Sequence, residues 1–141
     1  MTKFQNSLAL GLIQKVPPDP LRAKSLLKAS KDAVHSAKAL PFEPAHLRSI
    51  MRELYEGLRV YCEAIGYLHG FKFSNHESLT PFIAEFLQDE RAALRFDKYR
   101  KIRNGITYYG DSIAPEFVKD SLHDLPELIK TLEKHTINRE K

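Results

Sequence analysis

The sequence feature that most constrains the fold is one long apolar stripe between Pro44 and Leu68. Its members recur at spacings of three and four residues: Leu47, Ile50, Met51, Leu54, Leu58, Tyr61, Ile65 and Leu68. This spacing places the side chains on one side of an α-helix about six turns long, and it does not suit a strand, where side chains alternate. A helix of that length has to bury its stripe against other helices, so we expect the chain to fold around it.

Proline and glycine residues divide the rest of the chain into shorter helical segments. We predict further helices over Phe4–Lys15, Leu21–Ala39, Leu79–Leu87, Asp89–Ile106 and Pro115–His135. Pro126 should kink or split the last of these, and Phe71–Phe73 and Ile106–Tyr108 are too short for a sheet to be expected. The predicted fold class is all-α, an up-and-down antiparallel bundle of four to six helices.

The predicted helix over Leu21–Ala39 differs from the others because its inward side is mostly small. That side comprises Ala23, Leu27, Ser30, Val34 and Ala37. Small side chains let a neighbouring helix approach closely. Asp19 is placed to cap this helix, with Pro20 in its first turn. We therefore divide the chain into an N-terminal arm or short helix over residues 1–18 and a single helical domain over 19–141.

Composition excludes several classes of protein. The single cysteine, Cys62, rules out an internal disulfide framework and a cysteine-rich zinc site, and we expect it to be a buried thiol. No metal ion or cofactor is predicted. The uncharged stretch over Phe4–Gln14 is too short and too polar to span a membrane, so a cytoplasmic protein that does not insert into membranes is expected.

Positive charge is concentrated in two segments. Residues 1–40 carry seven basic and two acidic side chains, and residues 91–103 carry six and one, whereas residues 41–90 carry four and eight. A concentrated basic surface attracts phosphates and makes their binding sensitive to salt. The alternative is a solvated helix face with no ligand.

One arginine of the second basic segment falls on the apolar side of its helix. At about 100° per residue, Arg103 lies in the same sector as Phe96 and Tyr99. A guanidinium cannot stay unpaired in an apolar interior. Arg103 should therefore either pair with a buried carboxylate, such as Glu63 or Glu77, or line a polar cleft between helices.

The residues around Arg103 resemble the signature region of HEPN domains. The stretch is Arg100-Lys101-Ile102-Arg103-Asn104-Gly105-Ile106-Thr107-Tyr108-Tyr109-Gly110. In that family a helix carries Arg, usually followed by Asn, then three more residues and His. The link over residues 70–77 also resembles that of small standalone prokaryotic members. The likeness covers most of the chain from about Asp19 onward.

The resemblance implies a helical bundle that dimerises and brings two signature motifs to one cleft. Many HEPN domains are metal-independent ribonucleases, and others bind nucleotides or act as toxin partners of small nucleotidyltransferases. The family histidine falls on Tyr108 or Tyr109 here, and a tyrosine with a pKa near 10 is a poor general base at neutral pH. We therefore expect this chain to share the fold and the homodimer of HEPN domains more readily than their catalytic activity.

Two functions follow from this pattern. The first is a module that binds a nucleotide, RNA or a nucleotidyltransferase partner through a cleft around Arg103, and the second is a metal-independent, toxin-like endoribonuclease. The candidate catalytic residues are Arg103, Asn104, Tyr108 and Tyr109. The candidate binding residues are Arg95, Tyr99, Arg100, Arg103 and His76. His76 is included because its link could bring an imidazole to the Arg103 cleft.

Overall fold

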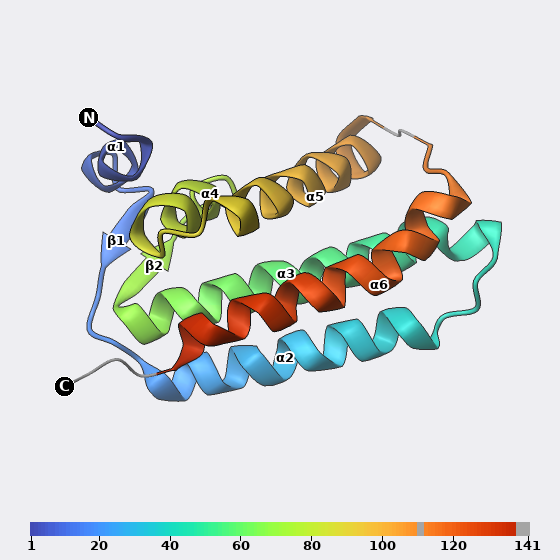
Figure 1. Cartoon of the computed structure of the whole chain (residues 1–141), viewed down its shortest axis with the longest axis horizontal. Coiled ribbons are helices and arrows are strands. Elements are labelled where there is room, and N and C mark those ends of the chain that lie inside the picture. Colours follow the sequence, from blue (N-terminus) through green and yellow to red (C-terminus); the bar gives the residue numbers. More distant parts are fainter. Residues whose placement is uncertain (110–111, 138–141) are drawn as a thin grey trace.

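The computed structural model describes residues 1–109 and 112–137, with the backbone alone at 107–109. The helices and strands are α1 (Lys3–Ala9), β1 (Ile13–Lys15), α2 (Pro20–Ala39), the 3-10 turn η1 (Pro44–His46), α3 (Leu47–His69), β2 (Phe71–Phe73), α4 (Leu79–Pro81), the π-helical turn η2 (Phe82–Phe86), α5 (Glu90–Tyr109), α6 (Pro115–Leu132) and the 3-10 turn η3 (Glu133–Thr136). The four long helices α2, α3, α5 and α6 alternate in direction (Figure 1). The predicted up-and-down antiparallel bundle is confirmed.

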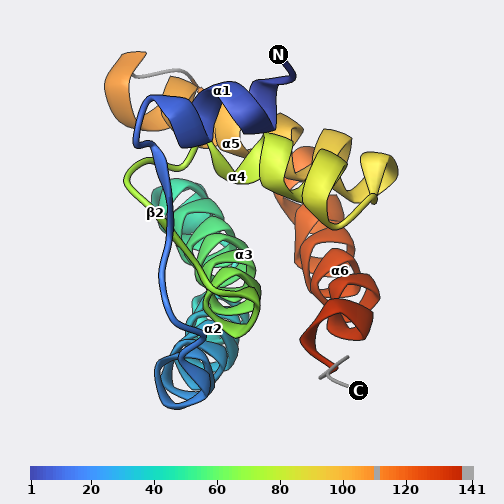
Figure 2. The same ribbon diagram turned by 90° about the vertical axis from the view of Figure 1, so that its left-hand side faces the viewer.

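Helix α3 lies at the centre of the bundle and supplies more buried hydrophobic residues than any other helix that the structure describes. Viewed end-on, α2, α5 and α6 surround it on three sides (Figure 2). Its predicted stripe is buried at Ile50, Leu54 and Leu58, and burial extends to Tyr55 and Cys62 on other sides of the helix. Burial raises the pKa of the Cys62 thiol, as expected for a structural cysteine.

The N-terminal segment folds differently from the single helix predicted for it. Helix α1 is capped by Thr2 and ends at Ala9, and Gly11 then turns the chain with φ of +77°. Strand β1 pairs antiparallel with β2, with Ile13 opposite Phe73. The expectation that Phe71–Phe73 would not form a strand was wrong, because its hydrogen-bonding partner is distant in sequence. The predicted arm thus packs on the bundle through this ladder.

Helices α2 and α3 pack closely, as the small residues of α2 predicted. Ser30 donates a hydrogen bond of 2.6 Å to the Gly57 carbonyl oxygen, and both residues are buried. A Cβ atom at Gly57 would lie only 2.7 Å from Val34 Cγ2. Leu27 and Val34 point inward as expected, since Leu27 packs against a buried cluster that includes Ala64 and Val34 lies against Gly57. Both side chains are nevertheless only half-buried.

Two helix boundaries correct the sequence-based prediction. Helix α6 runs unbroken through Pro126, so the predicted split is absent. Helix α5 continues past Gly105 to Tyr109, although we expected it to end near Ile106. A glycine costs a helix only about 1 kcal/mol, and the buried Ile106 anchors the next turn in the core. Every helix among the described residues is either too short or too polar to be a membrane span.

Candidate functional site

Helix α5 carries Arg103 to the surface of α3. The helix begins after Asp89, whose carboxylate accepts a hydrogen bond of 3.2 Å from the Ala92 backbone. Phe96 and Tyr99 are buried on its inner side, and Arg103 follows one turn later, half-buried. The guanidinium carbon of Arg103 lies 5.9 Å from the centre of the Tyr55 ring. This is the outer range of a cation–π contact, and the ring holds the charge near an apolar surface.

A histidine from the link between β2 and α4 completes the site. The Asn75 side chain accepts a hydrogen bond of 2.9 Å from the Ser78 backbone and fixes the turn of this link. His76 Nδ1 then lies 3.3 Å from the Tyr55 hydroxyl, and the two rings are 5.8 Å apart. His76 therefore meets α3 at the same tyrosine as Arg103.

Three arginines lie around Tyr55, and two of them are paired with carboxylates. Arg59 donates to Glu56 at 2.8 Å and also pairs with Glu63. Arg100 donates twice to the same Asp97 oxygen, at 3.0 and 2.8 Å.

Arg103 differs from Arg59 and Arg100. Among the residues that the structure describes, no carboxylate forms an ion pair with Arg103. Neither Glu63, which pairs with Arg59, nor Glu77 neutralises it. We call Tyr55, Arg59, His76, Arg100 and Arg103 the Tyr55 cluster.

The cluster disfavours a positive charge on His76 and a negative charge on Tyr55. Burial and, to a smaller extent, the positive charges of Arg59 and Arg103 together lower the pKa of His76 from 6.5 to about 4. Burial also raises the pKa of Tyr55, although the arginines oppose this shift. At neutral pH the imidazole is therefore uncharged and the phenol protonated. The Nε atom of Arg59 is buried and has no hydrogen-bond partner among the described residues.

An open cavity of about 580 Å³ lies beside the cluster. Its walls come from α1, the link and α5, and Arg100 and Lys101 lie on the α5 side. Glu77 and Asp97 also line it, so the cavity carries both signs of charge. Arg100 thus connects the cavity with the neighbourhood of His76, whose pKa its charge lowers.

The other predicted site residues have different places. Tyr99 is buried and packs against Phe117 at 6.1 Å, so it belongs to the core and not to a binding surface. Arg95 donates to Glu127 on α6 at 2.8 Å and does not join the Tyr55 cluster. Asn104 is half-buried next to Arg103. The side chains of Tyr108 and Tyr109 lie outside the described residues.

Two residues of the cluster were missed by sequence reasoning. Tyr55 and Arg59 lie one turn apart on α3, beside the apolar stripe. The sequence did contain a signal for Arg59, because Glu56 lies three residues before it and Glu63 four residues after it. On a helix these spacings predict ion pairs that hold the arginine side chain in one position. No pattern in the sequence links Arg59 with His76, because the two residues belong to different elements that only the folded structure brings together.

Comparison of the chain with models of protein families, with curated proteins and with solved structures finds no match. The resemblance to HEPN domains therefore stays a prediction from the residues around Arg103 and the link over residues 70–77. Among the described residues, no group of three or more His, Cys, Asp or Glu side chains is arranged to hold a metal ion.

Proposed function

We propose that this chain is a HEPN-like helical module that binds a phosphate group of RNA or of a nucleotide at the Tyr55 cluster. The observation that carries the proposal is the half-buried guanidinium of Arg103, which has no ion pair with any described residue while Arg59 and Arg100 have theirs. A phosphate oxygen would satisfy this guanidinium with charge-assisted hydrogen bonds. The uncharged imidazole of His76 would offer a further donor without repelling the arginines.

The proposal includes a homodimer, as the family resemblance implies, and a cytoplasmic location where RNA and nucleotides are present. A symmetric dimer would place two Tyr55 clusters in one assembly. A nucleotidyltransferase partner belongs to the same proposal. The net charge of +4 and the basic segment at residues 91–103 support association with a polyanion.

Binding of a short fluorescently labelled RNA, measured by anisotropy at low salt, tests the proposal. Replacement of Arg103 by alanine should weaken the affinity by about tenfold or more, because a hydrogen bond to a charged group contributes roughly 1.5–3 kcal/mol. Arg91→Gln is the matched control, since it removes one charge from the exposed start of the same helix. Equal affinities of the Arg103→Ala and parent proteins would refute the assignment.

A second function, a metal-independent endoribonuclease, is favoured by the position of His76. Where the family histidine would be, this chain has tyrosines, but the fold supplies an imidazole 3.3 Å from Tyr55. In such a reaction the 2′-oxygen would bond to phosphorus as the bond to the 5′-oxygen breaks. The 2′-hydroxyl proton would pass to His76, and Tyr108 or Tyr109 would protonate the leaving oxygen while Arg103 stabilises the phosphorane charge.

Cleavage of a labelled RNA in EDTA separates the two functions. An active nuclease should lose cleavage in both the Arg103→Ala and His76→Gln proteins and keep it in Arg91→Gln. Binding without cleavage by the parent protein would support the non-catalytic module and reject the nuclease.

A further inference from the structure

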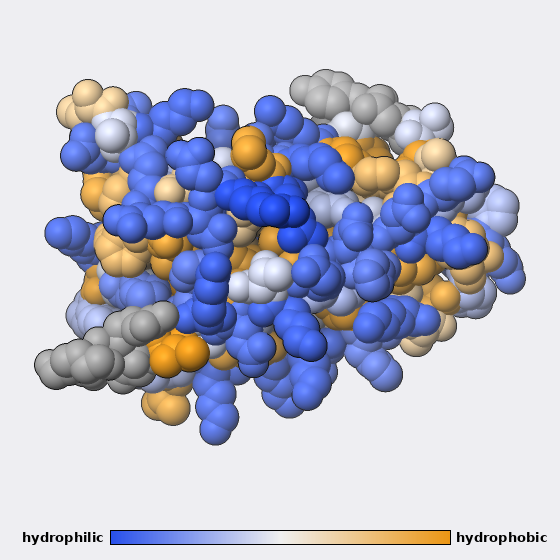
Figure 3. All heavy atoms as spheres, viewed as in Figure 1, coloured by the Kyte–Doolittle hydropathy of each residue, from blue (hydrophilic) through white to orange (hydrophobic). Residues whose placement is uncertain are grey.

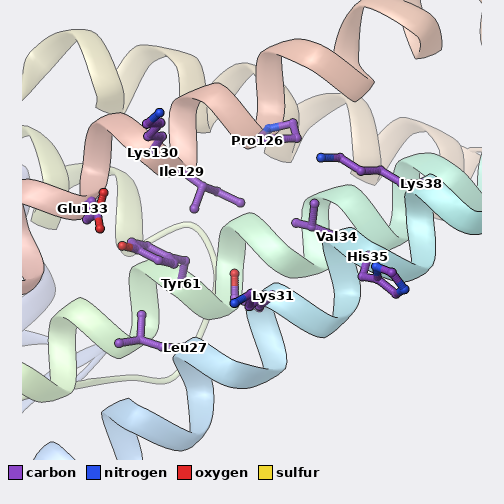
Figure 4. Close-up of a pocket in the computed structure, with 11 residues that line it drawn as sticks. Leu27, Lys31, Val34, His35, Lys38, Tyr61, Pro126, Ile129, Lys130 and Glu133 are labelled. Atoms are coloured by element: carbon purple, nitrogen blue, oxygen red, sulfur yellow. The ribbon is translucent and has the colours of Figure 1, made fainter.

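A groove of about 460 Å³ lies between α2 and α6 (Figure 4). Its apolar lining comprises Leu27, Val34, Tyr61, Pro126 and Ile129. The groove exists because α2 and α6 each pack on α3 by other side chains. Small residues of α2 face α3, and α6 buries Val118, Leu125 and Leu128.

The apolar lining of this groove is only partly covered by the chain itself. Leu27, Val34 and Ile129 are half-buried, as is Tyr61 on α3. In Figure 4 the side chains of Val34, Tyr61 and Ile129 gather between the two flanking helices. Figure 3 shows that hydrophilic atoms cover most of the face on which α6 lies, with apolar patches between them.

Lysines surround the apolar lining. Lys31 and Lys38 come from α2 and Lys130 comes from α6, and all three are exposed. Within the described part of the chain none of the three forms an ion pair. Figure 4 shows Lys38 extending from α2 toward Pro126. Glu133 is the acidic side chain among the lining residues, so the rim is net positive.

We infer that this groove binds an acidic amphipathic helix of a partner protein. The apolar side of such a helix would cover the half-buried lining, and carboxylates flanking that side would meet the lysines. The α2 side of the groove runs from Leu27 to Lys38, which corresponds to about 16 Å or three helical turns.

The charge of the rim argues against a second copy of this chain as the occupant. A symmetric contact would bring Lys31, Lys38 and Lys130 against the same lysines of the other copy. Like charges placed opposite one another disfavour the contact, whereas carboxylates on a partner favour it and speed association. The groove is also separate from the Tyr55 cluster, so this inference stands without the proposed function.

Two synthetic peptides test the inference on the full chain. Both are helical, about four turns long, with a leucine stripe at spacings of three and four residues. One carries glutamates beside the stripe and the other carries lysines at the same positions. In fluorescence anisotropy the glutamate peptide should bind about tenfold more tightly or better, because its charge complements the rim. Equal affinities of the two peptides would overturn the inference.

Variants identify the groove as the binding site. Lys31→Glu combined with Lys38→Glu should reverse the preference between the peptides. The control combines Lys15→Glu with Lys72→Glu, which changes the net charge by the same amount on the exposed β1–β2 ladder. This control should leave the preference between the peptides unchanged. Ile129→Glu should abolish binding of both peptides, with circular dichroism as the check on folding.

Unchanged preference in the α2 double variant would contradict the inference even if Ile129→Glu failed to fold, since both lysines are exposed. Self-association of the parent chain that Ile129→Glu removes, without any peptide binding, would assign the groove to a second copy and also overturn it.

Discussion

The Tyr55 cluster and the α2–α6 groove both present positive charge, but in opposite ways. Arg103 is half-buried, and its planar guanidinium lies 5.9 Å from the centre of the Tyr55 ring. Lys31 and Lys38 are exposed on long flexible stems around an apolar surface. A planar guanidinium suits the geometry of one phosphate, whereas ammonium groups on flexible stems select a partner by its overall charge.

Helix α3 supports both regions and keeps them apart. Arg59 belongs to the cluster and Tyr61 to the groove, and two residues correspond to about 200° around a helix. One buried helix thus carries two surfaces of different chemistry. A change on one side of α3 should therefore leave the other side intact, and the following variants test this separation.

The largest effect on stability is expected from Gly57→Ala, on the groove side. The new Cβ would lie 2.7 Å from Val34 Cγ2 and 3.2 Å from the Ser30 carbonyl oxygen. Crowding of a packed core at this level costs about 1–3 kcal/mol, partly offset by the better helix propensity of alanine. Urea unfolding should show a loss of about 1–2 kcal/mol, and the glutamate peptide should bind more weakly because Val34 lines the groove.

Gly11→Ala serves as its control. Gly11 has open space around it and a φ of +77°, so alanine there introduces backbone strain without crowding α2 against α3. Peptide affinity should be unchanged in this protein. A Gly57→Ala protein as stable as the parent, with full peptide affinity, would show that the α2–α3 contact does not shape the groove.

The next effect is a pH dependence from the cluster side. Folding lowers the pKa of His76 from 6.5 to about 4. Between pH 6.5 and about pH 4, His76 is therefore protonated in the unfolded chain and uncharged in the folded chain. Stability linked to His76 is therefore fully present above pH 6.5 and is lost as the pH falls toward 4. The difference in unfolding free energy between the parent and His76→Gln proteins isolates this effect, and a difference independent of pH would contradict the burial of His76.

Ser30→Ala should lower the free energy of unfolding by about 1 kcal/mol, because the buried Gly57 carbonyl would lose its 2.6 Å hydrogen bond from the serine. Thermal and urea unfolding measure it. His76 should keep its pKa in this protein, since the change lies on the other side of α3. A shifted His76 pKa would show that the two surfaces are coupled.

The smallest effect is expected from Arg95→Ala. Arg95 pairs with Glu127, whose side chain is half exposed, and solvent screening leaves such pairs with little effect on stability. RNA affinity should fall less than about twofold, because salt screens the attraction between the RNA and a single charge that lies away from the binding site. A loss as large as that of Arg103→Ala would extend the binding surface to the α6 side of α5.

The sequence allowed the long helices to be predicted because their information is local. The stripe of α3 and the small residues of α2 both follow from spacing along the chain. The β1–β2 pair could not be predicted, because three residues such as Phe71–Phe73 acquire a partner only through the fold. Gly105 and Pro126 suggested breaks that core packing overrides.

The candidate site was predicted in part. Arg103 on the apolar side of its helix and the approach of His76 both hold in the structure. Arg95 and Tyr99 were included because they share the basic segment, but charge along a sequence does not tell which side of a helix faces a cleft. Tyr55 joins the site because α3 is buried on several sides, which a single stripe does not reveal.

The most direct test of the central claim is the pKa of His76, measured by NMR with and without a short RNA. A phosphate bound at Arg103 would place negative charge beside the imidazole, so the pKa should rise from about 4 on addition of RNA. The rise should be absent in the Arg103→Gln protein. A His76 pKa that stays the same at saturating RNA would show that no phosphate occupies the Tyr55 cluster and would contradict the proposed function.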